Sequence, residues 1–112
     1  MLSFRLKNHP GCNCHVDIDV YKKVIHFISY TTEILRCELE EDGLWSITCV
    51  GAYSHTDDTP FTKTTARQIS WFLREYFPSV SYYTVKDAAI KNYVINSEFG
   101  ARLSKDIGGH LV

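Results

Sequence analysis

Apolar and polar side chains alternate through the first half of the chain, with the period of two that predicts half-buried β-strands. The pattern predicts strands over residues 2–7, 15–21, 24–30, 33–39 and 45–49. The chain must reverse direction between these segments, and Pro10 and Gly11 supply the first turn. Consecutive strands joined by short turns predict a largely antiparallel sheet of four or five strands.

The apolar residues of the last hairpin predict its register. The apolar rows within residues 35–39 and 45–49 must face the same side of the sheet, because a slip of one residue would send one row into water. A two-residue turn at positions 42 and 43 cannot satisfy both rows. A three-residue loop with Gly43 in the left-handed conformation satisfies them, and it places Leu39 opposite Trp45.

The four cysteines are expected to be thiols, because the N-terminus carries no export signal and the expected compartment is a reducing cytoplasm. The hairpin register sets Cys37 and Cys49 diagonally, roughly 7–8 Å apart. That separation is too long for an unstrained disulfide, so both are expected to be buried core residues. Cys12 and Cys14 flank a single residue beside the first turn.

A capped amphipathic helix is predicted over residues 64–77. Its apolar positions follow the spacing that makes one continuous stripe: Ile69, Phe72, Leu73, Tyr76 and Phe77. Thr65 begins a capping-box sequence, and Thr62 or Thr64 would cap a slightly longer helix. Pro78 ends the pattern.

These elements predict one α+β domain over residues 1–95. The main helix packs across one face of the antiparallel sheet, and a shorter second helix follows at residues 84–94. Residues 96–112 have no strong period and are expected to form a loosely ordered tail.

Two short phrases of the sequence carry a family resemblance. They are Ser29-Tyr30-x-Thr32 at a strand start, and Tyr53-Ser54 followed by Thr64-Thr65-x-Arg67 at the helix start. The pair resembles the "S-Y-x-T" and "Y-S-x-T-T-x-x-H" phrases of a family of short, mostly phage-encoded proteins of unknown function. Residues 55–63 interrupt the second phrase here, and Gln68 stands where the family tends to have His. The resemblance implies a small α+β domain of phage or prophage origin, and it brings no catalytic residues.

The same positions also have a structural interpretation that needs no family. Thr64 and Thr65 suit a helix cap. Tyr30 and Tyr53 are expected to close strands, with their rings in the core and their hydroxyls at its edge.

Residue types that bind metals occur together near the first turn. Cys12 and Cys14 precede His15 and Asp17, and these are all metal-ligand types. The mixture matches no standard zinc set, and His15 points away from Cys14 on a strand. The competing interpretation is a solvated strand face beside a turn with two thiols, so no metal is expected.

Catalytic residue types also occur together in the loop before the main helix, at Ser54, His55, Asp57 and Asp58. Neighbours in an extended segment point apart, whereas a triad needs its nucleophile and base within hydrogen-bonding reach. Neither a nucleophile elbow nor a phosphate loop or dinucleotide fingerprint is present. The expected protein is therefore not an enzyme and has no cofactor.

A basic stripe is the best candidate for a binding surface. Lys63, Arg67, Ser70 and Arg74 share the helix face opposite the apolar stripe. Such a face suits a phosphate group or an acidic protein surface, although it is also what an ordinary solvated helix presents. His55, Asp57 and Asp58 of the preceding loop are expected to extend this partner-binding surface.

Charge and hydropathy narrow the function classes. Twelve basic and thirteen acidic residues give a net charge of −1, without the broad positive footprint of a nonspecific nucleic-acid binder. No apolar run approaches the ~18 residues of a membrane span, so no membrane partner is expected. We expect a cytoplasmic, phage-type protein that binds a host protein stoichiometrically, as an inhibitor of a host defence (anti-CRISPR-like) or transcription protein. The alternative is a nucleic-acid or small-anion binding module that uses the basic helix face.

Overall fold

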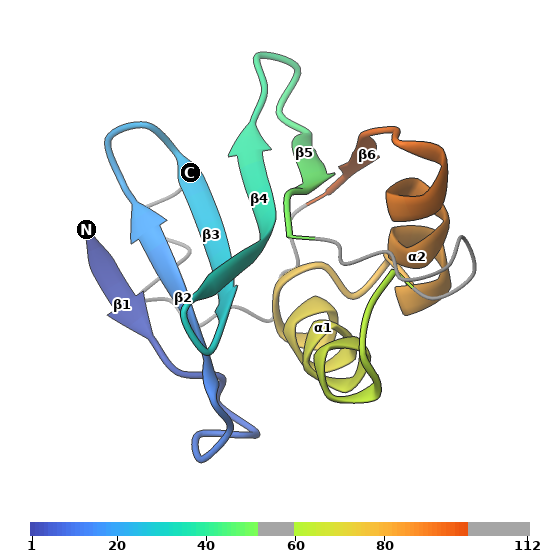
Figure 1. Ribbon diagram of the computed structural model, residues 1–112. Helices are drawn as coiled ribbons and strands as arrows, with labels where there is room; N and C mark the ends of the chain where they lie inside the picture. The colour runs from blue at the N-terminus through green and yellow to red at the C-terminus, as the bar shows by residue number, and fades with distance from the viewer. Residues whose placement is uncertain (52–59, 99–112) are drawn as a thin grey trace.

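One antiparallel sheet of six strands, with two helices, makes up the described part of the chain in the computed structural model, which describes residues 1–51 and 60–98 (Figure 1). The strands lie in the sheet in their order along the chain. The elements are β1 (Leu2–Phe4), β2 (Cys14–Asp19), β3 (Val24–Ser29), β4 (Thr32–Leu39), β5 (Trp45–Cys49), α1 (Lys63–Tyr76), α2 (Tyr82–Lys91) and β6 (Ile95–Ser97). The predicted α+β class is confirmed, but the sheet has six strands rather than four or five.

The strand that the pattern missed is β6, which forms one edge of the sheet. It pairs antiparallel with residues 45–47 of β5, and it buries Ile95 and Ser97 while Asn96 points outward. Three residues are too few to display a period in the sequence. Asn96 and Ser97 therefore belong to the sheet, whereas residues 99–112 lie outside the described residues.

The register predicted for the β4–β5 hairpin is confirmed. Leu39 lies opposite Trp45, and Cys37 lies opposite Ile47. The loop is closed by the backbone N–H of residue 40, which donates to the carbonyl of residue 44 at 2.8 Å. Gly43 adopts φ +86°, the left-handed conformation that this three-residue loop requires.

The turn between β2 and β3 contains no Gly, Pro or Asn. Asp19 compensates, because its Oδ1 accepts hydrogen bonds from the backbone N–H groups of Tyr21 at 3.1 Å and Lys22 at 3.0 Å. This Asx turn reverses the chain, with Lys23 at φ 57°.

Both helices begin at hydroxyl caps. Thr62 caps α1, with its side chain accepting from the backbone N–H of Thr65 at 3.2 Å, so the longer of the predicted helices is the one that forms. Ser81 caps α2, which therefore begins at Tyr82, two residues before the predicted start at residue 84. Asn92, in the left-handed conformation, ends α2 earlier than predicted.

The helices cover one face of the sheet and leave the other open (Figure 1). α1 packs on β3, and α2 packs on β5 and β6. All five residues of the predicted apolar stripe are buried, including Phe77, which is the C-cap of α1. Phe72 stacks on Phe27 of β3 with ring centroids 4.7 Å apart.

The expectation that Cys37 and Cys49 are buried core thiols holds fully for Cys37 only. Cys37 is free and buried, whereas Cys49 is free but half-buried. Cys49 lies near the boundary between the sheet and α2, where its thiol donates to the carbonyl of Val85.

Candidate functional site

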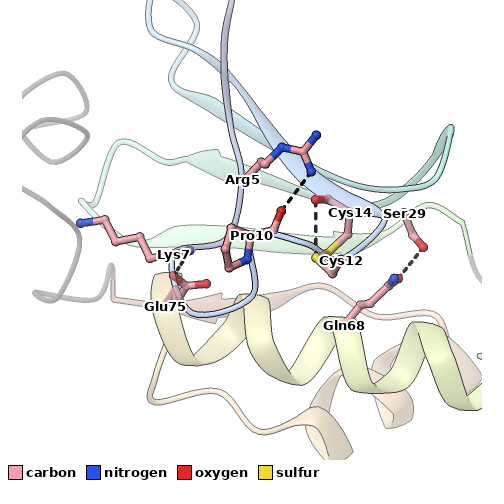
Figure 2. Close-up of a disulfide and its surroundings, with 8 residues drawn as sticks. All are labelled: Arg5, Lys7, Pro10, Cys12, Cys14, Ser29, Gln68 and Glu75. Carbon is pink, nitrogen blue, oxygen red and sulfur yellow. Dashed lines mark hydrogen bonds between the residues drawn. A yellow bond between two sulfur atoms is a disulfide. The ribbon is translucent and has the colours of Figure 1, made fainter.

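The loop between β1 and β2 is fastened to the side of α1 (Figure 2). The backbone N–H of Lys7 donates to Oε1 of Glu75 at 2.6 Å, and Leu6 beside it is fully buried. The ring of His9 stacks on Trp71, with centroids 3.8 Å apart. These contacts hold in place the segment that carries the first two cysteines.

Cys12 and Cys14 form a disulfide in this segment (Figure 2), with their Cα atoms 5.4 Å apart. The expectation that all four cysteines are thiols is therefore wrong for this pair. The physical reason is a bend of the chain at Cys12 and Asn13, directly before β2, which brings the two cysteines together across a single residue. Cys14 is buried, whereas Cys12 is half-buried.

The disulfide also bears on whether Cys12, Cys14, His15 and Asp17 could bind a metal ion. Both sulfur atoms are bonded to each other, and His15 pairs instead with Asp17, Nε2 to Oδ1 at 3.5 Å. Across residues 1–51 and 60–98, no group of three or more His, Cys, Asp or Glu residues is placed to hold a metal ion.

An open pocket of about 500 Å³ lies beside the disulfide. Its walls come from the end of β1, the start of β2 and the β3–β4 turn, and they include Arg5, Cys12, Cys14, His15 and Tyr30. β1 pairs only with residues 16–18 of β2, so the first two residues of β2 have no β1 partner at this point. The pocket therefore occupies the place where β1 leaves the sheet.

Tyr30 contradicts the expectation of a core ring. Its side chain is 61% exposed at the pocket, and its backbone takes φ 55°. Its N–H donates to the carbonyl of Asn13 at 2.6 Å, which continues the β2–β3 ladder by one residue. Alternation along β3 already places residue 30 on the face opposite buried Ser29, so the expectation is wrong because it followed the amphipathic character of tyrosine and not the period of the strand.

Charged and polar side chains occupy the face of the sheet that the helices leave open. His26 Nδ1 pairs with Oε2 of Glu33, and Oε1 of the same carboxylate accepts from Arg36 Nη2 at 2.7 Å. The apolar pattern does not reveal this group, although the β3–β4 register, which sets His26 opposite Arg36, could have done so.

A second group on the open face contains the residue types of a catalytic triad. The Ser3 hydroxyl donates to Asp17, and His15 pairs with the same carboxylate. Because the carboxylate stands between the hydroxyl and the imidazole, the histidine is not placed to take the serine proton. This group is a polar surface network, not a nucleophilic site.

The structure brings the predicted basic residues of α1 to one exposed face. Lys63, Arg67 and Arg74 are exposed, and within residues 1–51 and 60–98 none of them forms an ion pair. Ser70 is half-buried and donates its hydroxyl to the carbonyl of Ala66 at 3.1 Å, so it contributes little to that face. The other predicted binding residues, His55, Asp57 and Asp58, lie outside the described residues.

A cluster of exposed apolar side chains, which sequence analysis did not identify, lies on and just after α2. The α2 patch consists of Tyr83, Ile90, Tyr93 and Val94, which are between 40% and 77% exposed. Positions 83 and 90 share one side of α2 at helical spacing, which is the signal that could have found them, whereas residues 93 and 94 follow the left-handed cap that ends the helix.

Charged groups at the edge of the α2 patch hold one of its rings. The Tyr93 hydroxyl donates to Oδ2 of Asp87 at 2.9 Å, and Lys91 Nζ lies 3.1 Å from Oδ1 of the same carboxylate. The hydrogen bond from Tyr93 lowers the pKa of Asp87, and it raises the pKa of Tyr93. The patch therefore has an apolar centre with an ordered, charged edge.

No protein-family model, curated protein or solved structure matches the chain. In the described parts of the chain, neither helix has the length and the apolar run that crossing a bilayer requires.

Proposed function

We propose that the protein acts by stoichiometric binding to another protein, and that the α2 patch forms the centre of the contact. The observation that carries this proposal is the exposure of two tyrosines and two aliphatic residues together, beside an ordered charged edge. Protein interfaces are enriched in tyrosine at their centres and polar at their rims. Exposed apolar clusters on a small domain favour a macromolecular contact over a purely solvated surface.

The basic face of α1 supports the same class of function. Its three exposed cations have no ion-pair partner in the parts of the chain that the structure describes, so they are available to an acidic partner surface. Charge of this kind raises association rates and orients the partner more than it adds affinity. The partner we propose is a host protein of defence or transcription, a role that rests on the resemblance to short phage-encoded proteins.

The test is a pull-down from lysate of the native host with matched variants. Tyr83→Ala/Tyr93→Ala should lower recovery of the partner at least about tenfold, because interface tyrosines commonly contribute more than ~1 kcal/mol each. Tyr21→Ala is the control, since Tyr21 is an even more exposed ring, at 94%, and lies in the β2–β3 turn outside the α2 patch. Equal recovery with both variants would contradict the role of the α2 patch.

The alternative of nucleic-acid or small-anion binding is favoured by one observation, the grouping of Lys63, Arg67 and Arg74 on a single exposed face. The salt dependence of binding and the effect of charge-reversal variants distinguish this alternative from protein binding. Phosphate binding to a labelled oligonucleotide should weaken steeply with salt and disappear in Arg67→Glu/Arg74→Glu. A protein contact centred on the α2 patch should instead persist at moderate salt, and recovery of the partner should fall mainly in the tyrosine variants.

A further inference from the structure

We propose that the Cys12–Cys14 disulfide is a site of thiol–disulfide exchange, which oxidises one dithiol of an extended peptide segment for each protein molecule. The proposal concerns a surface separate from the α2 patch and does not depend on the proposed function. It rests on three features of the described structure: unequal access to the two sulfur atoms, a pocket beside them, and an unpaired length of strand along that pocket.

The two sulfurs differ in access to solvent. Cys14 is only 3% exposed, whereas Cys12 is half-buried in the loop before β2. Exchange requires a thiolate to reach one sulfur along the bond while the other departs. Cys12 is therefore the sulfur that is attacked, and Cys14 is the one that leaves.

The pocket explains how a substrate would reach Cys12. It has about 500 Å³ of space and is lined by both cysteines, by Arg5 and by His15. That volume falls within the range that holds small ligands or a short piece of peptide. The guanidinium of Arg5, which donates to the carbonyl of Pro10 at 3.0 Å, supplies positive charge beside the reacting sulfurs, and such charge stabilises a thiolate.

The open edge of β2 favours an extended peptide as substrate. β1 pairs with β2 only as far as Phe4 and Val16, so Cys14 and His15 have no strand partner on the β1 side, where the pocket lies. On its other side this stretch is paired with β3, through residues 13–15. An extended segment can add to such an edge through main-chain hydrogen bonds, which would bring its own side chains alongside the disulfide.

The exchange balances without any further reactant. A substrate thiolate attacks Sγ of Cys12, a new S–S bond forms, and the Cys12–Cys14 bond breaks with its electron pair passing to Sγ of Cys14, which takes up a proton. The second substrate thiolate then attacks the substrate sulfur of the mixed disulfide, and Cys12 leaves and is protonated. The dithiol has lost two electrons and two protons, and the two cysteines have gained them.

The loop is built to survive this reduction. The N–H of Tyr30 donates to the carbonyl of Asn13 between the two cysteines, and upstream His9 stacks on Trp71 while Lys7 bonds to Glu75. The segment is therefore held by contacts other than the disulfide. A cross-link that the surrounding fold makes redundant for stability is free to change its redox state.

The other two cysteines do not compete for this role. Burial raises the pKa of Cys37 well above its ordinary value and raises the pKa of Cys49 to about 11. Both are therefore thiols at neutral pH, and the thiol is a poor nucleophile compared with the thiolate.

The first experiment uses the native chain and reduced glutathione. Protein purified without reductant is exposed to glutathione while folded, quenched in acid, alkylated with N-ethylmaleimide and mapped by mass spectrometry. Glutathione should appear on Cys12 with Cys14 alkylated, and Cys37 and Cys49 should carry no glutathione. Glutathione on Cys14, or an intact Cys12–Cys14 bond under conditions that reduce the urea-unfolded chain, would overturn the proposal.

A second experiment compares two variants that each lack one cysteine of the pair, and both are checked for folding by circular dichroism. Cys14→Ser leaves the accessible sulfur, and Cys12→Ser leaves the buried one as the matched control. At neutral pH the Cys12 thiol of Cys14→Ser should react with 5,5′-dithiobis(2-nitrobenzoate) at least about tenfold faster than the Cys14 thiol of Cys12→Ser, while Cys37 and Cys49 are common to both variants. Equal or reversed rates would contradict the assignment of Cys12 as the attacked sulfur.

A third experiment tests the pocket rather than the sulfur. Tyr30→Asn removes a pocket wall and keeps a residue that tolerates the left-handed backbone. It should slow oxidation of a peptide dithiol several-fold and leave oxidation of reduced dithiothreitol unchanged, because dithiothreitol is too small to need that wall. Equal slowing with both dithiols, or with neither, would argue against a peptide site.

Discussion

The hydroxyl of Ser29 donates a hydrogen bond to the side-chain amide oxygen of Gln68, across the buried boundary between β3 and α1 (Figure 2). Their side chains are 4% and 3% exposed, so the pair is sealed from water. Ser29 begins the first of the two phrases that carry the family resemblance, and Gln68 stands at the histidine position of the second. The two phrases, far apart in the sequence, therefore meet at one hydrogen bond.

This buried pair should behave as a coupled unit in unfolding experiments. Ser29→Ala should lower the free energy of unfolding by about 1–3 kcal/mol, because it leaves the buried amide of Gln68 without its partner. Ser29→Ala/Gln68→Leu should be less destabilising than the sum of the two single changes, since the double variant leaves no unsatisfied polar group. Urea unfolding of all four proteins measures the coupling.

The control for this cycle is Ser46→Ala. Ser46 donates its hydroxyl to Glu40 at the solvent-exposed end of the β4–β5 hairpin, where water can replace the lost bond. Its removal should change stability by less than about 0.5 kcal/mol. Simple additivity of Ser29→Ala and Gln68→Leu would mean that the hydrogen bond contributes nothing specific.

The orientation of α1 gives a second prediction. Phe72 is fully buried and stacks on both Phe27 and Tyr76, with ring centroids 4.7 Å and 4.9 Å away. Phe72→Ala should therefore cost roughly 3–5 kcal/mol, the range for truncating a core aromatic. Arg67→Ala, on the exposed face, should change stability by well under about 1 kcal/mol. Equal urea midpoints for the two variants would contradict the orientation of the helix.

Residues with a clear period or a demanding turn could be predicted from the sequence. The stripe of α1 and the β4–β5 register follow from a single rule, that apolar rows must share a face, and Gly43 then selects the loop. β6 could not be predicted in this way, because its three residues carry too little pattern and its place depends on how α2 returns the chain to β5. The exposure of Tyr30, by contrast, agrees with the alternation that buries Ser29, and the expectation of a core ring was wrong because it rested on residue type.

The candidate sites were less predictable than the fold. The basic face of α1 follows from helical spacing alone, and its three cations are exposed as the pattern predicts, whereas Ser70 is half-buried. The Cys12–Cys14 bond was missed because the expectation rested on cellular compartment alone, whereas the bend at residues 12 and 13 that brings the pair together is a feature of the folded loop. The pocket depends on where β1 leaves β2, which is a tertiary relationship that no local pattern reports.

The hairpin loop provides a third prediction, which compares the effect on stability of replacing two glycines by alanine. Gly43→Ala should lower the free energy of unfolding by about 1–2 kcal/mol, because a Cβ is disfavoured at φ +86° even though no atom lies within 4 Å of it. Gly11→Ala is the matched control, since its Cβ would also meet nothing within 4 Å and its φ is not positive. Similar losses in both variants would show that chain flexibility, not the left-handed conformation, sets the effect.

The last prediction concerns alkaline stability and begins from Cys49. Burial raises its pKa from 9.0 to about 11, and burial likewise raises the pKa of Cys37 and of Tyr76. The folded protein therefore holds these protons more tightly than the unfolded chain does. The resulting stabilisation is fully present below the unfolded pKa and is lost as pH rises through the folded pKa.

The free energy of unfolding should accordingly fall between about pH 9 and about pH 11, because the unfolded chain gives up its thiol protons first. Cys49→Ser should make this fall shallower, since a serine hydroxyl can still donate to the carbonyl of Val85 but does not titrate in that interval. Urea unfolding of both proteins across the interval, without reductant, measures the two slopes. Parallel slopes would mean that Cys49 ionises equally easily in the folded and unfolded chains, and that its burial against α2 is not maintained in solution.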